Sequence, residues 1–136
     1  MRVFKNAWFD RFARKHGIVD AALWEAVERA RQGLIDAELG GGVIKQRVAR
    51  PGQGKSGGFR AVILYRTAER AFFVYGFAKS DRDNINADEV AAFKQAARHV
   101  LELSEAHLSW LVDKKQFTEV HDHDKEISER SLRGHP

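Results

Sequence analysis

Basic side chains are concentrated in one stretch of this 136-residue chain. Residues 43–82 carry nine basic and two acidic side chains, a net charge of +7, whereas the whole chain carries +4. Such a patch suits the phosphates of a polyanion such as RNA or DNA. It also fits the solvated surface of an ordinary basic protein, so charge alone leaves both interpretations open. The nine basic residues are Lys45, Arg47, Arg50, Lys55, Arg60, Arg66, Arg70, Lys79 and Arg82.

A predicted β-hairpin brings several of these residues together. Residues 59–65 and 70–79 are rich in β-branched and aromatic types and flank a turn. With the turn centred near Ala68, residues whose numbers sum to about 136 face each other, which places Arg60 near Gly76. The end of the hairpin away from the turn therefore gathers cations and a ring. These residues are Lys55, Arg60, Phe77, Lys79 and Arg82.

The second strand of the hairpin ends an aromatic row with a cation. Alternation puts Tyr75, Phe77 and Lys79 on one face of the strand. A base stacked over a ring with its phosphate beside the cation would fit this row. Packing in the core is the competing explanation. We favour core packing for Phe73 and Tyr75 and leave both explanations open for Phe77.

Several other functions are disfavoured by the sequence. The chain has no cysteine, which excludes disulfides, thiol catalysis and cysteine-based zinc sites. Gly54-Lys55-Ser56 lacks the upstream glycine and the following helix of a phosphate-binding loop. His121 and His123 have the types of metal ligands but fall in a predicted tail, so we expect no metal and no cofactor. No apolar stretch approaches the ~18 residues of a membrane helix, and no signal peptide is apparent.

Two helices should precede the hairpin. An apolar stripe predicts a helix over residues 6–16 that ends at Gly17. Asp20 is a candidate N-cap for a second helix. That helix carries an apolar stripe at three- and four-residue spacing. The stripe consists of Leu23, Val27, Ala30 and Leu34.

The remaining elements predict an α+β domain. Residues 43–48 form a strand, 50–58 a loop, and Asn86 begins a helix with a capping-box-like start. Ser104 restarts a short helix, residues 117–120 form a last short strand, and Met1–Phe4 is a possible first strand. We expect a small antiparallel sheet with helices on one face and the other face free for the basic residues. Residues 121–136 read as a disordered, charged tail that is dispensable for catalysis.

The hairpin and its flanks resemble the RelE/HigB toxins of type II toxin–antitoxin systems, and are closest to the HigB-like branch. The resemblance covers about residues 1–120. It rests on Gly54-Lys55-Ser56-Gly57-Gly58-Phe59-Arg60, the strand at 61–66, and the segment at 70–85 that ends in Lys79-Ser80-Asp81-Arg82-Asp83-Asn84-Ile85. It implies a RelE-like fold and a cytoplasmic, ribosome-dependent endoribonuclease that cuts mRNA. It also implies neutralisation by a cognate antitoxin protein that binds DNA.

The resemblance implies cleavage without a metal, by attack of the ribose 2′-hydroxyl on the adjacent phosphate. Arginine is well suited to stabilise the negative charge that develops, and Arg60 is the first candidate, with Arg82 the second. Lys55 and Lys79 would hold flanking phosphates or transfer a proton. Asn84-Ile85 stands where the best-known pattern has a tyrosine after Arg82, so the general acid and base stay unassigned. Residues expected to bind RNA are Arg47, Arg50, Phe77 and Asn84.

Two other functions compete with the nuclease. A ParE-like inhibitor of gyrase uses the same scaffold, but that branch commonly lacks the basic cluster seen here. A nucleic-acid-binding module without activity would share the cluster, and only an activity measurement separates it from a nuclease.

Overall fold

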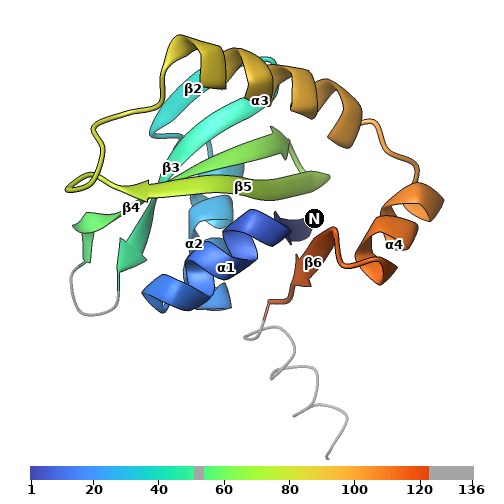
Figure 1. Cartoon of the computed structure of the whole chain (residues 1–136), viewed down its shortest axis with the longest axis horizontal. Coiled ribbons are helices and arrows are strands. Elements are labelled where there is room, and N and C mark those ends of the chain that lie inside the picture. Colours follow the sequence, from blue (N-terminus) through green and yellow to red (C-terminus); the bar gives the residue numbers. More distant parts are fainter. Residues whose placement is uncertain (51–53, 123–136) are drawn as a thin grey trace, which may run out of the picture.

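The computed structural model describes residues 1–50 and 54–122, without the side chains of residues 54–56. The tail predicted over residues 121–136 lies outside the described residues from His123 onward. The described part comprises six strands and four helices (Figure 1). In chain order they are β1 (Arg2–Asn6), α1 (Ala7–His16), α2 (Asp20–Arg31), β2 (Ala37–Gly40), β3 (Val43–Arg50), β4 (Gly54–Arg66), β5 (Arg70–Ala78), α3 (Ala87–Val100), α4 (Glu105–Asp113) and β6 (Phe117–Val120).

The strands form one sheet in the order β2-β3-β4-β5-β1-β6. The predicted α+β class is therefore confirmed, with helices packed on a small sheet. The sheet is mixed, because β1 runs parallel to β5 while the other neighbours are antiparallel. A parallel pair needs a long connection, and here that connection comprises α1, α2 and three strands.

Helices cover both faces of the sheet, not only one. In β4, Phe59, Ala61 and Ile63 pack in the core beneath α1 and α2, whereas Val62 and Leu64 pack in a second core with α3 and α4. Figure 1 shows α3 on the side of the sheet opposite α1 and α2. An almost continuous apolar run is typical of a strand buried on both faces, which explains why β4 does not alternate apolar and polar residues.

Most predicted helix ends are confirmed by their caps. The Asn6 side chain accepts a hydrogen bond from the Phe9 amide at the start of α1, and Gly17 ends that helix with φ 67°. Asn86 and Glu89 form the predicted capping box of α3. Ser104 caps α4 by accepting from the His107 amide.

The second helix differs from its prediction at both ends. Val19 occupies the N-cap position and Asp20 is already helical. Leu34 lies beyond the end of α2 and is 58% exposed, so it does not continue the apolar stripe. The chain leaves the helix at Gln32 and Gly33 instead, and Gly33 has φ 82°, a conformation that favours glycine.

Two strand predictions also need correction. The predicted loop over residues 50–58 is largely strand, because β4 begins at Gly54 and Gly54 pairs with Arg50 of β3. The short strand β2 was not predicted. It pairs with β3 through a turn at Gly40, Gly41 and Gly42, all of which have positive φ.

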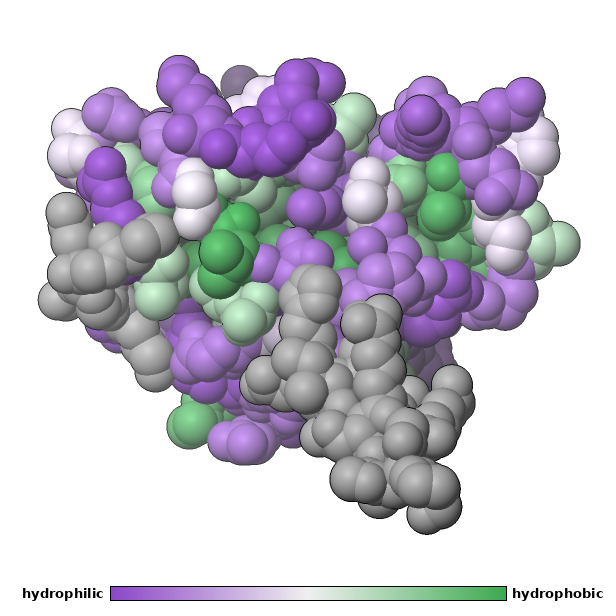
Figure 2. All heavy atoms as spheres, turned by 90° about the horizontal axis from the view of Figure 1, so that it is seen from below, coloured by the Kyte–Doolittle hydropathy of each residue, from purple (hydrophilic) through white to green (hydrophobic). Residues whose placement is uncertain are grey.

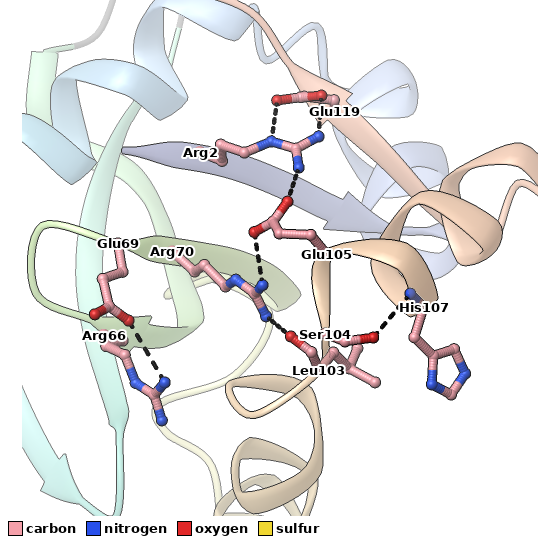
Figure 3. Close-up of polar contacts among 9 residues, drawn as sticks. All are labelled: Arg2, Arg66, Glu69, Arg70, Leu103, Ser104, Glu105, His107 and Glu119. Atoms are coloured by element: carbon pink, nitrogen blue, oxygen red, sulfur yellow. Dashed lines mark hydrogen bonds and ion pairs between the residues drawn. The ribbon is translucent and has the colours of Figure 1, made fainter.

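Ion pairs attach α4 to the sheet. Glu105, in the first turn of α4, bonds the guanidinium of Arg2 at 2.7 Å and that of Arg70 at 2.8 Å (Figure 3). Arg2 also makes a bidentate contact with Glu119 of β6. These contacts join β1, β5, β6 and α4 at the end of the sheet where the β4–β5 turn lies.

Candidate nucleic-acid interface

A β-bulge in the hairpin sets the position of Arg60. From Arg66 to Ile63 the pairing follows the predicted sum of 136, but Val62 pairs with Tyr75 and leaves Val74 as an extra residue. Arg60 consequently lies opposite Phe77, and the predicted pairing with Gly76 is displaced by one residue. The sequence prediction assumed a regular hairpin centred on the turn, and nothing in the sequence indicated this extra residue.

The strand on the other side of Arg60 contributes a second cation. Arg47 of β3 is the direct cross-strand partner of Arg60, and Lys45 follows on the same face of β3. Burial, followed by repulsion from Arg60 and Lys79, lowers the pKa of Lys45. Four cations therefore share one end of the sheet. We name Lys45, Arg47, Arg60 and Lys79 the basic cluster.

Arg60 is the least satisfied member of the basic cluster. Its Nη1 atom is buried and has no hydrogen-bond partner among the described residues. Burial, followed by repulsion from Arg47, lowers the pKa of Arg60, and Asp36 opposes this shift. A guanidinium remains charged throughout, so this site holds an incompletely compensated positive charge. Such a charge is stabilised by an incoming anion.

Arg82, the second predicted catalytic residue, has its donors engaged within the protein. Its Nε donates to the Asn84 carbonyl at 2.8 Å, and its Nη1 donates to the Tyr75 hydroxyl at 2.9 Å. Both terminal nitrogens also contact the Glu89 carboxylate. The hydrogen bonds with Glu89 and then Tyr75 raise the pKa of Arg82. One of its five N–H groups is left for a ligand, too few for a bidentate phosphate contact.

Asp36 supports the basic cluster and was not singled out from the sequence. Its carboxylate accepts a hydrogen bond from the Arg47 amide at 2.7 Å and contacts the side chain of Arg29. Partial burial raises the pKa of Asp36, but the Arg47 amide and then Arg29 outweigh this and lower it. The buried Gln46 fixes Asp36 further by accepting from its amide at 2.7 Å.

The other predicted site residues occupy different surroundings. Phe77 is 4% exposed and packs in the core, so its ring supports Arg60 from the neighbouring strand and offers little face to a base. Arg50 lies over the ring of Phe59 at 5.2 Å. Asn84 accepts a hydrogen bond from Lys45 at 2.8 Å, which ties the segment after β5 to the basic cluster. The Lys55 backbone lies in β4, and its side chain is outside the described part.

A family model described as the RelE toxin of the RelE/RelB toxin–antitoxin system matches residues 1–120. The chain belongs to the RelE toxin family. No curated protein matched the chain in a sequence search. Family membership makes this RelE-family protein a toxin of a toxin–antitoxin system, and the matched range extends from the first strand to the last.

Acidic partners neutralise the opposite end of the hairpin in this RelE-family protein. Arg66 bonds Glu69, and Arg70 bonds Glu105 (Figure 3). Arg66 also bonds Glu102. The +7 segment is thus divided into a paired end and an end whose cations converge on Arg60. Within the described residues, Arg47 is the one member of the basic cluster with an ion pair, to Asp36 at 3.4 Å, so incomplete compensation, not total charge, distinguishes the candidate interface.

Two further searches were confined to residues 1–50 and 54–122 of the RelE-family protein. Within these ranges, no group of three or more metal-ligating side chains was found. No helix there is both long enough and apolar enough to span a membrane.

Proposed function

We propose that this toxin is a cytoplasmic, ribosome-dependent endoribonuclease that inhibits translation by cutting mRNA. The observation that carries the proposal is the buried Nη1 of Arg60, which has no hydrogen-bond partner in the part of the chain that the structure describes. An arginine held on a paired strand is preorganised for an anion that forms during a reaction. Family membership supports the choice of an RNA-cleaving toxin over other uses of such a site.

The proposed reaction needs no metal. The 2′-hydroxyl oxygen attacks the adjacent phosphorus, the bond from phosphorus to the 5′-oxygen breaks, and a 2′,3′-cyclic phosphate and a 5′-hydroxyl result. One proton leaves the 2′-hydroxyl and one reaches the 5′-oxygen. Arg60 stabilises the charge on the phosphorane, and Arg47 and Lys79 hold flanking phosphates.

Lys45 is the proposed proton-transfer group. Its pKa is lowered by burial and by the neighbouring cations, so its neutral form is more accessible than that of an ordinary lysine. Its ammonium group donates to Asn84, which holds it at the edge of the basic cluster. Arg82 takes a positioning role in this scheme, because it fixes the segment that carries Lys79 and Asn84.

The decisive experiment adds the purified protein to ribosomes translating a defined mRNA and maps the new RNA ends. We expect 5′-hydroxyl ends that appear only when ribosomes are present. Arg60→Ala should lower the cleavage rate by about 100-fold or more. Arg66→Ala is the matched control, because Arg66 lies on the same strand and at the paired end of the hairpin. Equal cleavage by wild type and Arg60→Ala would overturn the assignment of Arg60.

The same preparation tests the competing functions. Inhibition of gyrase supercoiling without mRNA cleavage would indicate a ParE-like toxin. RNA binding without cleavage would indicate a binding module.

For the partner, we propose that a cognate DNA-binding antitoxin covers the basic cluster with acidic or helical segments. Co-expression with the product of the adjacent gene should yield a complex and restore growth, and failure of both would count against this partner.

A further inference from the structure

We propose that the outward face of α1 is a second RNA-binding surface, which holds RNA flanking the segment bound at the basic cluster. This inference rests on the proposed RNA substrate. The surface consists of Trp8, Arg11, Phe12, Lys15 and His16, which line a hollow of about 250 Å³ on one side of the helix. We name it the α1 surface.

The aromatic part of the α1 surface is a ladder of rings. Trp8 stacks on Phe12 with ring centroids 5.2 Å apart, and His16 lies 4.6 Å from Phe12. Residues four apart on a helix share a face, which is why the three rings are stacked along it. Trp8 remains 38% exposed although its neighbours are rings. Because Phe12 and Tyr75 both stack on Trp8, a nucleic-acid base would contact the part of the ladder that remains open to solvent.

The cationic part of the α1 surface is uncompensated. Within the described residues, Arg11 and Lys15 make neither an ion pair nor a hydrogen bond. The acid nearest in sequence, Asp10, is engaged by Lys5 and Arg14. Arg11 and Lys15 are four residues apart, so both flank the ring ladder on the same side of the helix. Two cations unpaired within the described residues, beside a partly exposed ring ladder, match a phosphate backbone with its bases.

The α1 surface contacts two elements next to the basic cluster, from the opposite face of the sheet. The His16 ring lies 4.9 Å from the ring of Phe59, the residue before Arg60, and Arg50 covers that same ring. At the other end, Trp8 stacks on Tyr75, whose hydroxyl accepts a hydrogen bond from Arg82. Figure 1 shows the C-terminal end of α1 beside the β3–β4 end of the sheet. Because Phe59 and Arg60 point to opposite faces of β4, one RNA chain that contacts both surfaces would pass around this end of the sheet.

The character of this side of the molecule favours RNA over an apolar protein partner. Figure 2 views the side on which α1 and α2 lie, and the surface there is mainly hydrophilic with small, separate hydrophobic patches. A protein interface of ordinary size has a contiguous apolar centre, which such separate patches do not supply. An acidic protein segment is the alternative ligand, and the experiment must distinguish it from RNA.

The test compares two double variants that remove the same charge. Arg11→Ala/Lys15→Ala removes both cations from the α1 surface. Arg98→Ala/Lys114→Ala removes two exposed cations from α3 and the end of α4. The probe is a fluorescein-labelled oligouridylate of about 12 nucleotides, and its binding is followed by anisotropy over a range of salt concentrations. The first variant should bind about tenfold more weakly, with the salt dependence reduced by about 1.4 in log–log slope.

The control variant should bind nearly as wild type, and ultraviolet cross-linking should map RNA to the peptide spanning residues 7–16. Equal weakening in both double variants would overturn the inference, because net charge would then explain the effect. Unchanged RNA binding in the first variant, with lost capture of the adjacent gene's product, would assign the α1 surface to an acidic protein segment instead. If wild type cleaves mRNA and the first variant cleaves it with unchanged KM, the α1 inference fails while the nuclease stands. If wild type neither binds nor cleaves RNA, the proposed function itself fails.

Discussion

Arg60 on β4 lies directly opposite Phe77 on β5, one residue beyond the position that a regular hairpin would give it. The displacement comes from the bulge at Val74. The side chain of Asn6 secures this bulge by donating a hydrogen bond to the Val74 carbonyl at 3.1 Å. The same side chain accepts from the Phe9 amide at 2.8 Å, so one residue holds both the bulge and the start of α1.

Substitution of Asn6 separates these two roles. Asn6→Ala loses both hydrogen bonds and should lower the free energy of unfolding by about 1–2 kcal/mol. Asn6→Asp keeps the acceptor for the Phe9 amide but loses the donor to Val74. We expect Asn6→Asp to keep more stability in urea unfolding, yet to lose mRNA cleavage because the register beside Arg60 is disturbed. Wild-type cleavage by both variants would show that the bulge does not position Arg60.

Glu89→Gln tests the positioning role of Arg82. The amide keeps an acceptor for the capping box and weakens the pair with Arg82. Removal of an acid near bound RNA should tighten RNA binding by Coulomb attraction alone. If Arg82 positions the segment that carries Lys79, cleavage should instead fall roughly tenfold. The matched control is Asp88→Asn, an exposed acid in the same helical turn, and a rise in cleavage by Glu89→Gln would contradict the positioning role.

Lys45→Arg distinguishes proton transfer from phosphate binding. Arginine keeps the positive charge but does not deprotonate in a protein. RNA binding measured by anisotropy should stay close to wild type, whereas the cleavage rate should fall on the order of 100-fold. Lys45→Ala serves as the reference variant that loses both properties. Full activity of Lys45→Arg would restrict Lys45 to binding.

Asp36 makes stability depend on pH in the acid range. Its pKa is lower in the folded protein than the ordinary value of about 3.9. The stability that it contributes is therefore present above about pH 4 and is lost as the pH falls through the folded pKa. Asp36→Asn should be less stable at neutral pH and should lose less stability between about pH 4 and pH 2. Urea unfolding across this range checks the slope, and Asp113→Asn, an exposed carboxylate on α4, is the control.

The sequence predicted the parts of the fold that local chemistry determines. Asn86 and Ser104 have the types and spacing of helix caps, and Gly17 has the type of a helix end, so these boundaries are confirmed. The strand β2 and the full extent of β4 depend on pairing with β3, which a local pattern does not encode. Coverage of both sheet faces depends likewise on which face α3 packs against, and a local sequence pattern does not encode this.

The candidate site was predictable in composition and less so in arrangement. The hairpin prediction grouped Arg60, Lys79 and Arg82, and Arg82 ranked second to Arg60 for catalysis, because sequence does not show that Glu89 and Tyr75 occupy the donors of Arg82. Lys45 and Asp36 join the site only through cross-strand and loop contacts. Neither residue stands in a motif. Alternation along β3 would have put Lys45 and Arg47 on one face, but it did not show that this face meets Arg60.

The order of the strands has a consequence for synthesis of the toxin. β1 is the first strand to be translated, yet its neighbours in the sheet are β5 and β6. One edge of β1 has its partner once β5 has been made, whereas the other edge stays without a partner until β6 has emerged from the exit tunnel, so the sheet is completed late in synthesis. Since Asn6 at the end of β1 also holds the bulge beside Arg60, a truncated nascent chain would lack the register of the completed protein.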